Sequence, residues 1–171
     1  AHVRDGVEKG RFGNDKIIEA VKRVSGHGIN VGANYIFGLP DDTETSMQAT
    51  LGLACELNTP WANFYCAMAY PGSPLHKVAK GRGWFLPEDG PGWIGYSQHA
   101  FETLPLKTDT LSSAEVLAFR DAAFHHYFER PEYLSMLERK FGGTAVTQVQ
   151  EMTPRNEADA AADALADIGL A

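Results

Sequence analysis

The sequence lacks the features that mark several classes of protein most directly. No apolar run approaches the roughly 20 residues of a membrane-spanning helix, and the opening stretch AHVRDGVEKG has no hydrophobic signal-peptide core. Basic residues are in the minority, since 15 Lys and Arg stand against 22 Asp and Glu and leave a net charge of −7. Such a chain has no long-range attraction to nucleic-acid phosphates or anionic lipid. We therefore expect a cytoplasmic protein with a small-molecule substrate and neither a nucleic-acid nor a membrane partner.

Cysteine and metal-binding patterns are also scarce. Cys55 and Cys66 are the two cysteines of the chain, each lies in an apolar segment, and no CxxC motif is present. Two thiols cannot complete a tetrahedral metal site. His125 and His126 are adjacent, so on a helix they point about 100° apart, and the sequence has no HExxH motif. We expect two buried, reduced thiols and no metal site built from this chain.

The chain does contain an alternation of helices and strands. Apolar residues at helical spacing predict one helix after Asn14 as N-cap, and a second after Thr43 or Asp42. Strands are predicted over residues 29–37 and 61–70, and the second, WANFYCAMAY, is apolar on both faces, as is typical of a strand buried in a parallel sheet. Crossovers of this length imply parallel neighbours. The predicted fold class is therefore α/β.

The pattern changes beyond residue 70. The loop PGSP leads into a short predicted helix over residues 75–80, and a segment rich in glycine, proline and tryptophan follows. Ser112 or Ser113 is expected to cap a further helix that Pro131 interrupts, and another helix is predicted over residues 132–141. The remaining sequence is polar and then rich in alanine and aspartate, which predicts a frayed or weakly helical tail.

Both predicted strands stop at a turn that contains glycine and proline. These turns are Gly38-Leu39-Pro40 and Pro71-Gly72. One interpretation is a compact turn from strand to helix and nothing more. The other is ligand contact, because ligands of α/β proteins sit at the carboxyl ends of strands and glycine lets backbone approach closely. The residues alone leave both interpretations open.

Two motifs at a characteristic spacing resemble a known family. The run GINVGANYIFGLPDDTETSMQATLGLACEL, followed by NFYCAMAYPGSPL, resembles the second half of the core of radical S-adenosylmethionine enzymes, in which the fifth strand ends in a Gly-Leu-Pro turn. VRDGVEKG resembles the segment after the fourth strand. The resemblance covers about residues 3–80. It implies the C-terminal part of a partial (β/α)6 TIM-like barrel whose N-terminal half lies outside this chain.

The resemblance also implies roles for individual residues. Asn34 matches a fifth-strand position where a polar residue hydrogen-bonds the ribose of S-adenosylmethionine, and Ile36 matches the apolar residue that packs on the adenine. Gly38 would let the backbone approach that cofactor, and Lys9 matches a basic residue that faces its carboxylate. The alternatives are a buried amide satisfied by backbone for Asn34 and a solvated surface lysine for Lys9. No catalytic residue is assigned.

One departure from the family pattern is large. The CxxxCxxC motif, whose thiolates hold the 4Fe-4S cluster of the family, is absent from this sequence. We expect the cluster ligands in the N-terminal half of the same protein. The parent enzyme would then cleave S-adenosylmethionine reductively to a 5′-deoxyadenosyl radical that modifies an organic substrate, with methylation as one candidate outcome, while this fragment alone would be inactive.

The segment after the core resembles the C-terminal helical extension of radical enzymes that carry a cobalamin-binding domain, which adds cobalamin as a candidate cofactor. In that setting Tyr96, His99 and Glu102 are candidates for the substrate site, and Met68 and Tyr70 are stronger candidates for core packing. The expected division is 1–82 for the half-barrel, 83–142 for the loop and helical extension, and 143–171 for the tail. The alternatives are a non-catalytic binding or regulatory module and an ordinary TIM-barrel fragment.

Overall fold

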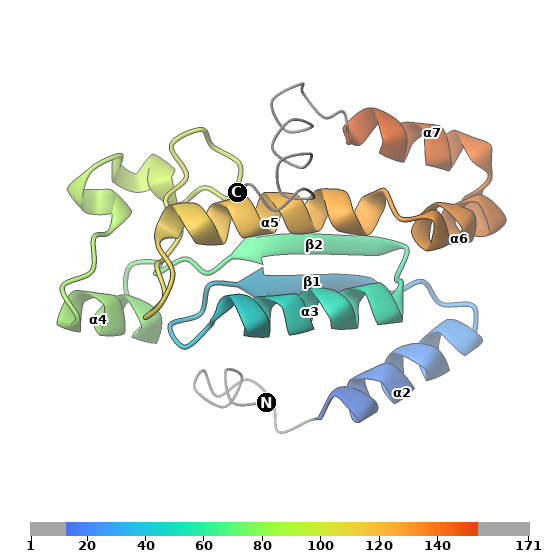
Figure 1. Ribbon diagram of the computed structural model, residues 1–171, viewed down its shortest axis with the longest axis horizontal. Coiled ribbons are helices and arrows are strands. Elements are labelled where there is room, and N and C mark those ends of the chain that lie inside the picture. Colours follow the sequence, from blue (N-terminus) through green and yellow to red (C-terminus); the bar gives the residue numbers. More distant parts are fainter. Residues whose placement is uncertain (1–12, 154–171) are drawn as a thin grey trace, which may run out of the picture. The chain divides into compact units, whose positions relative to one another are not determined.

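The structure is a computed structural model that describes residues 13–153. Over that range the chain forms six α-helices, two strands and two short 3-10 helices (Figure 1). These residues divide into two compact units, one ending at Tyr127 and the other beginning at Phe128. The first unit holds α2 (Asn14–Gly26), β1 (Gly32–Phe37), α3 (Glu44–Leu57), β2 (Trp61–Cys66), α4 (Pro74–Gly81), η1 (Pro87–Asp89), η2 (Gly92–Tyr96) and all but the last residue of α5 (Ser113–Phe128).

The two strands pair in parallel, which confirms the α/β class and the predicted order of helix, strand, helix and strand. Asn34 lies opposite Asn63 and Phe37 lies opposite Cys66, and α3 packs alongside β1 (Figure 1). The described residues form a two-stranded sheet, so the structure does not show a half-barrel. Both strands are shorter than predicted. The chain changes partner at Ala67, whose backbone N–H still donates to the Phe37 oxygen at 2.7 Å while its oxygen accepts from the N–H of Leu106 at 2.9 Å.

Burial alternates along both strands, and this contradicts the prediction that the second strand is buried on both faces. Ala62 and Phe64 are buried, whereas Asn63 between them is exposed. Trp61 keeps 55% of its surface exposed. Strand β2 therefore has the period of a half-buried strand, although its composition is that of a fully buried one.

Helix α3 begins and ends at local signals in the sequence. Thr43 is its N-cap, with its hydroxyl accepting from the backbone N–H of Ser46 at 3.2 Å while the Ser46 hydroxyl accepts from the N–H of Thr43 at 2.9 Å. Asn58 ends the helix in a left-handed conformation, with φ of 44°. The prediction of Asn14 as an N-cap is wrong, because Gly13 holds that position and Asn14 is the first helical residue of α2.

Helix α5 also starts at a capping box, in which the side chains of Ser112 and Glu115 each bond the backbone N–H of the other, as those of Thr43 and Ser46 do at α3. The Ser112 hydroxyl accepts from the N–H of Glu115 at 3.3 Å, and the Glu115 carboxylate accepts from the N–H of Ser112 at 2.7 Å. Of the two predicted caps, Ser112 is thus the one used. The glutamate carboxylate gains a charge-assisted bond at the positive end of the helix, where such a group is favoured.

The second unit contains α6 (Pro131–Phe141) and α7 (Gly143–Met152). Helix α6 confirms the helix predicted over 132–141 and begins at Pro131, which suits a first helical turn. Gly142, with φ of 82°, separates it from α7, which covers the first part of the predicted tail. The division at 82 and 142 stays a prediction. In the described part of the chain no helix is long and apolar enough to cross a membrane.

Candidate functional site

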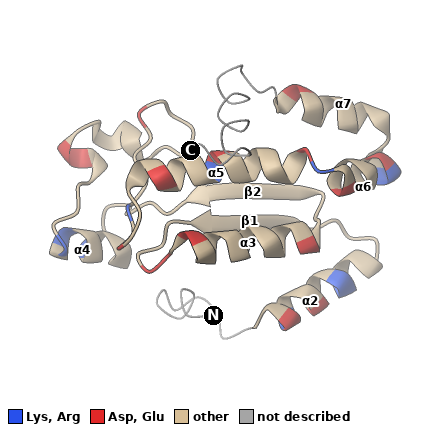
Figure 2. Ribbon diagram, viewed as in Figure 1, with Lys and Arg blue, Asp and Glu red and all other residues tan. Residues whose placement is uncertain are grey.

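One face of the two-stranded sheet is exposed, and we call it the open face. Its residues form three rows across the strands: Gly32 beside Trp61, Asn34 beside Asn63, and Ile36 beside Tyr65. Ile36 keeps 42% of its surface exposed although it is an apolar residue of strand β1. Neither strand carries a charged residue, as Figure 2 shows. The open face is therefore a neutral surface with amide groups between apolar side chains.

The opposite face, which we call the covered face, is packed beneath α5. The Phe37 and Phe119 rings meet edge to face with centroids 5.0 Å apart, and the Phe64 and Tyr127 rings meet in the same way at 5.4 Å. Phe37 and Tyr127 are fully buried. Edge-to-face contacts of this kind add to the free energy of apolar burial, so α5 fixes which face of the sheet stays open.

An amide pair occupies the middle row of the open face. The Nδ2 of Asn63 donates to the Oδ1 of Asn34 at 2.9 Å, and both side chains are exposed. Sequence reasoning selected Asn34 and missed Asn63. The signal was present, because each asparagine interrupts an otherwise apolar strand. The structure brings Asn34, Asn63 and the predicted residue Ile36 onto one surface. Asn34 and Asn63 lie side by side, and Ile36 lies one row further toward the end of β1.

The turn after β1 has a structural reason for its glycine. Gly38 has φ of 81°, and a Cβ placed on it would lie 2.5 Å from Cγ1 of Val116 on α5. Packing against α5 on the covered side is therefore enough to require glycine here. A cofactor contact by the Gly38 backbone stays a prediction.

Asp42 closes the same turn from within. It is 5% exposed, its Oδ2 accepts from the backbone N–H of Leu39 at 2.9 Å, and its own N–H donates to the Leu39 oxygen at 2.8 Å. The Ser46 hydroxyl donates to its other carboxylate oxygen at 2.5 Å. A carboxylate with this set of donors is held rigidly, so the strand end is fixed in place.

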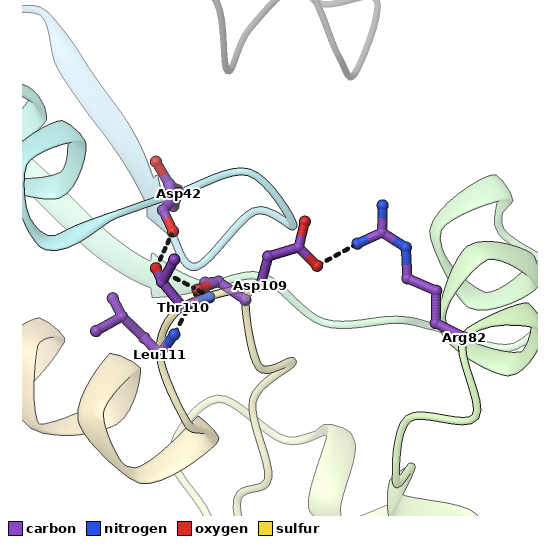
Figure 3. Close-up of polar contacts among 6 residues, drawn as sticks. Asp42, Arg82, Asp109, Thr110 and Leu111 are labelled. Carbon is purple, nitrogen blue, oxygen red and sulfur yellow. Dashed lines mark hydrogen bonds and ion pairs between the residues drawn. The ribbon is translucent and has the colours of Figure 1, made fainter.

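Residues 106–111 tie the turn after β1 to neighbouring segments. The backbone N–H of Asp109 donates to the backbone oxygen of Pro40 at 2.9 Å. The hydroxyl of Thr110 donates to the backbone oxygen of Asp42 at 3.3 Å. Figure 3 shows the Asp109 carboxylate turned the other way, toward Arg82 at the end of α4, with an N···O distance of 2.6 Å. The carboxyl ends of both strands thus belong to one bonded framework.

The turn after β2 is equally local in origin. The backbone N–H of Ser73 donates to the Tyr70 oxygen at 3.0 Å, and Gly72 has φ of 85°, as the third residue of a Pro-Gly turn requires. The Ser73 hydroxyl then accepts from the N–H of His76 at 3.1 Å and caps α4. Turn geometry and helix capping account for the whole Pro-Gly-Ser-Pro motif.

Gln98 is a second residue that sequence reasoning missed. Its Oε1 accepts from the backbone N–H of Cys66 at 3.1 Å, and its Nε2 donates to the Cys66 oxygen at 2.9 Å. The side-chain amide therefore pairs with the end of β2 in the way that another strand would. A single glutamine in an irregular loop gives no sequence signal for this role.

The other predicted residues are distributed unevenly. Met68 is buried, as the packing interpretation expected. That interpretation is wrong for Tyr70, which is 49% exposed, with its ring 5.7 Å from that of Tyr96. Tyr96 is buried beside Met68 and Val116. His99 and Glu102 are exposed on the loop after η2. Lys9 lies outside the described residues.

The two thiols do not form a cluster or metal site. Cys66 is buried on the covered face, and Cys55 lies half-buried on α3. Burial raises the pKa of Cys66 to about 11, with Arg120 opposing and Asp121 adding to that rise. Between residues 13 and 153 no group of three or more His, Cys, Asp or Glu side chains is placed to hold a metal ion.

Comparison with known proteins adds one partial relationship. No family model matches the chain. A stretch of 62 residues is 36% identical to an uncharacterized methyltransferase, PH0819, of Pyrococcus horikoshii. The matched stretch is 36% of this chain and 14% of that relative's length. The matched stretch thus corresponds to a small part of that relative, and the similarity supports a methyltransferase-like relationship for the stretch.

Proposed function

We propose that this chain is part of an S-adenosylmethionine-dependent enzyme, and that its open face holds one side of that cofactor. The observation that carries the proposal is the placement of Asn34 and Ile36 on one exposed, uncharged sheet face. Ligands of α/β proteins bind beside the carboxyl ends of parallel strands, and their sites are mostly apolar; Ile36 is the last but one residue of β1 and lies near that end. The similarity to a methyltransferase supports the choice of cofactor.

The residues present fit part of the cofactor. Ile36 offers an apolar surface to a planar base, and the Asn34 amide offers hydrogen-bonding groups to a sugar. The bonds of Asp42 and of residues 106–111 keep the strand end in a single position, which reduces the ordering cost of binding. When bound, S-adenosylmethionine supplies a sulfonium centre that is a source of methyl groups or, after reductive cleavage, of a radical.

We further propose that the chemistry is of the radical type, with a 4Fe-4S cluster and, in the subgroup that the C-terminal helices resemble, cobalamin. The thiols of Cys55 and Cys66 do not fit a cluster, because they are only two and Cys66 is buried on the covered face, where burial raises its pKa. Cluster ligands would belong to another part of the same protein. The role of this chain is then to bind and orient the cofactor and substrate.

The proposal is tested on the full-length protein. Its coding sequence upstream of Ala1 is expected to encode a CxxxCxxC motif, and the protein reconstituted with iron and sulfide is expected to absorb broadly near about 400 nm. S-adenosylhomocysteine should bind to it in calorimetry. Binding of S-adenosylhomocysteine by a protein without the CxxxCxxC motif would contradict radical chemistry and support a methyltransferase of another type. Absence of binding would contradict use of the cofactor altogether and favour a non-catalytic module.

A further inference from the structure

Asn63 forms an unusual pair with Asn34. Both residues sit at matched register positions of β1 and β2, in the middle of strands that are otherwise apolar. Asparagine is disfavoured inside strands, so two of them in one row need an explanation. Both side chains are exposed, so the Asn34–Asn63 bond is a cross-strand surface contact, which contributes only modestly to the stability of a sheet.

The direction of that bond determines how the Asn34 amide is turned. An asparagine carries one acceptor oxygen and one donor nitrogen. Because the Nδ2 of Asn63 donates to the Oδ1 of Asn34 at 2.9 Å, the Asn34 oxygen faces its neighbour and its Nδ2 is left to donate elsewhere. A ligand atom that meets Asn34 Nδ2 must therefore be an acceptor.

The next row along the strands offers a different chemistry. Ile36 and Tyr65 lie opposite each other, two residues further toward the carboxyl ends, which corresponds to about 7 Å. Together they present an apolar and an aromatic side chain beside the amide pair. A nucleoside has the matching sequence of parts, with a hydroxylated sugar next to a planar base that stacks on such side chains.

We infer that Asn63 is a positioning residue: it holds the Asn34 amide so that Nδ2 donates to a sugar hydroxyl of a nucleoside whose base lies on Ile36 and Tyr65. This inference rests on the proposed function, in which the nucleoside is that of S-adenosylmethionine. It adds a residue on β2 to the site and assigns a donor role to Asn34. The absence of charge on both strands agrees with recognition of a neutral sugar.

The experiment measures binding of S-adenosylhomocysteine and of its 2′-deoxy and 3′-deoxy analogues to the full-length, cluster-reconstituted protein by calorimetry. The variants are Asn34→Ala, Asn63→Ala, the double variant and Asn34→Asp. Gln48→Ala, an exposed amide on α3, is the matched control. Thermal unfolding of each variant separates loss of binding from loss of folding.

Asn34→Ala is expected to weaken binding about tenfold, as the loss of one hydrogen bond to a ligand does. Asn63→Ala should weaken it about threefold, because the Asn34 amide becomes free to turn. The double variant should bind no more weakly than Asn34→Ala, since Asn63 acts through Asn34. Asn34→Asp still accepts from Asn63 but has lost its donor, so it should bind at least as weakly as Asn34→Ala.

The deoxy analogues separate recognition from structure. The wild type should bind one of them about tenfold more weakly than S-adenosylhomocysteine, and Asn34→Ala should bind that analogue and the parent equally. Additive losses in the double variant, or the same preference for the hydroxyl in Asn34→Ala, would overturn the inference while leaving the proposed function intact. A wild-type protein that does not bind S-adenosylhomocysteine would overturn both.

Discussion

The two faces of the sheet differ more than their sequences suggest. On the covered face Phe37, Phe64 and Cys66 are buried beneath α5, and their neighbours are aromatic rings and the Val116 side chain. On the open face Ile36 and Asn34 remain exposed. Residues one position apart in the same strand thus have opposite environments, because successive side chains of a strand point to opposite faces.

The comparison teaches which residues hold the fold and which are left for binding. The covered face contains the tight contacts, including the approach of Val116 to Gly38. The open face has the amide pair and apolar side chains that gain little from their present surroundings. Exposed apolar residues grouped on one surface are typical of binding sites. Stability and ligand binding are therefore expected to respond to different substitutions.

The largest difference in stability is expected between one residue of the covered face and its neighbour on the open face. Phe37→Ala removes a fully buried ring and should lower the free energy of unfolding by about 3–5 kcal/mol. Ile36→Ala, one residue away, should lower it by about 1 kcal/mol or less and should weaken binding of S-adenosylhomocysteine instead. Urea denaturation with calorimetry of the full-length protein checks both. Equal destabilisation by the two substitutions would mean that the open face is covered in solution.

The second prediction concerns the glycine at the edge between the faces. Gly38→Ala places a methyl group against Val116 at a residue with φ of 81°, and should cost at least about 2 kcal/mol. Combining it with Val116→Ala removes the collision but not the backbone strain. The double variant should therefore be more stable than the sum of the two single effects predicts, by about 1 kcal/mol. Strict additivity in denaturation would show that Val116 does not impose the glycine.

A smaller effect is expected at the end of β2. Gln98→Ala leaves the N–H and C=O of Cys66 without their side-chain partner and should lower stability by about 1–2 kcal/mol. Gln98→Glu keeps the size of the side chain but has no N–H to donate, so it should not restore stability. Gln48→Ala serves as a control because that amide is exposed on α3. Stability of Gln98→Glu equal to that of the wild type would contradict the pairing.

The smallest effect is a pH dependence of the covered face. Burial raises the pKa of Cys66 from 9.0 to about 11, so the folded state binds this proton more tightly than the unfolded state does. The resulting stability is present below pH 9 and is lost as pH rises from 9 to 11. Between pH 8 and pH 10 the wild type should lose about 1 kcal/mol more than Cys66→Ala, measured by denaturation at both values. An equal loss of stability in the wild type and in Cys66→Ala between these two pH values would mean that the Cys66 thiol is in contact with solvent.

Local elements were the most predictable part of the fold. Thr43 and Ser112 cap their helices through bonds within four residues, and the Pro-Gly turn that ends at Ser73 follows from residue type alone. The length of β2 was not predictable in this way. The apolar residues continue to Tyr70, but the oxygen of Ala67 already accepts from the N–H of Leu106, which lies 39 positions further along the chain.

The candidate site was predictable in part. Asn34 and Ile36 stand at alternating positions of one strand, so their common face follows from the period of a strand. Asn63 required the parallel register of β1 and β2, and Gln98 required the fold of a loop that has no periodicity. Contacts between distant segments depend on the free energy of the whole packed state, which a local pattern does not contain.

By itself the sequence determined the order of helices and strands, their caps and turns, and the uncharged strands that a site of this kind uses. These features depend on neighbours within a few residues. Only the tertiary structure decided which face of the sheet is open. Helix α5 determines this, because Phe119 and Tyr127 pack against Phe37 and Phe64 and cover one face. The Asn34–Asn63 pair is left on the other face.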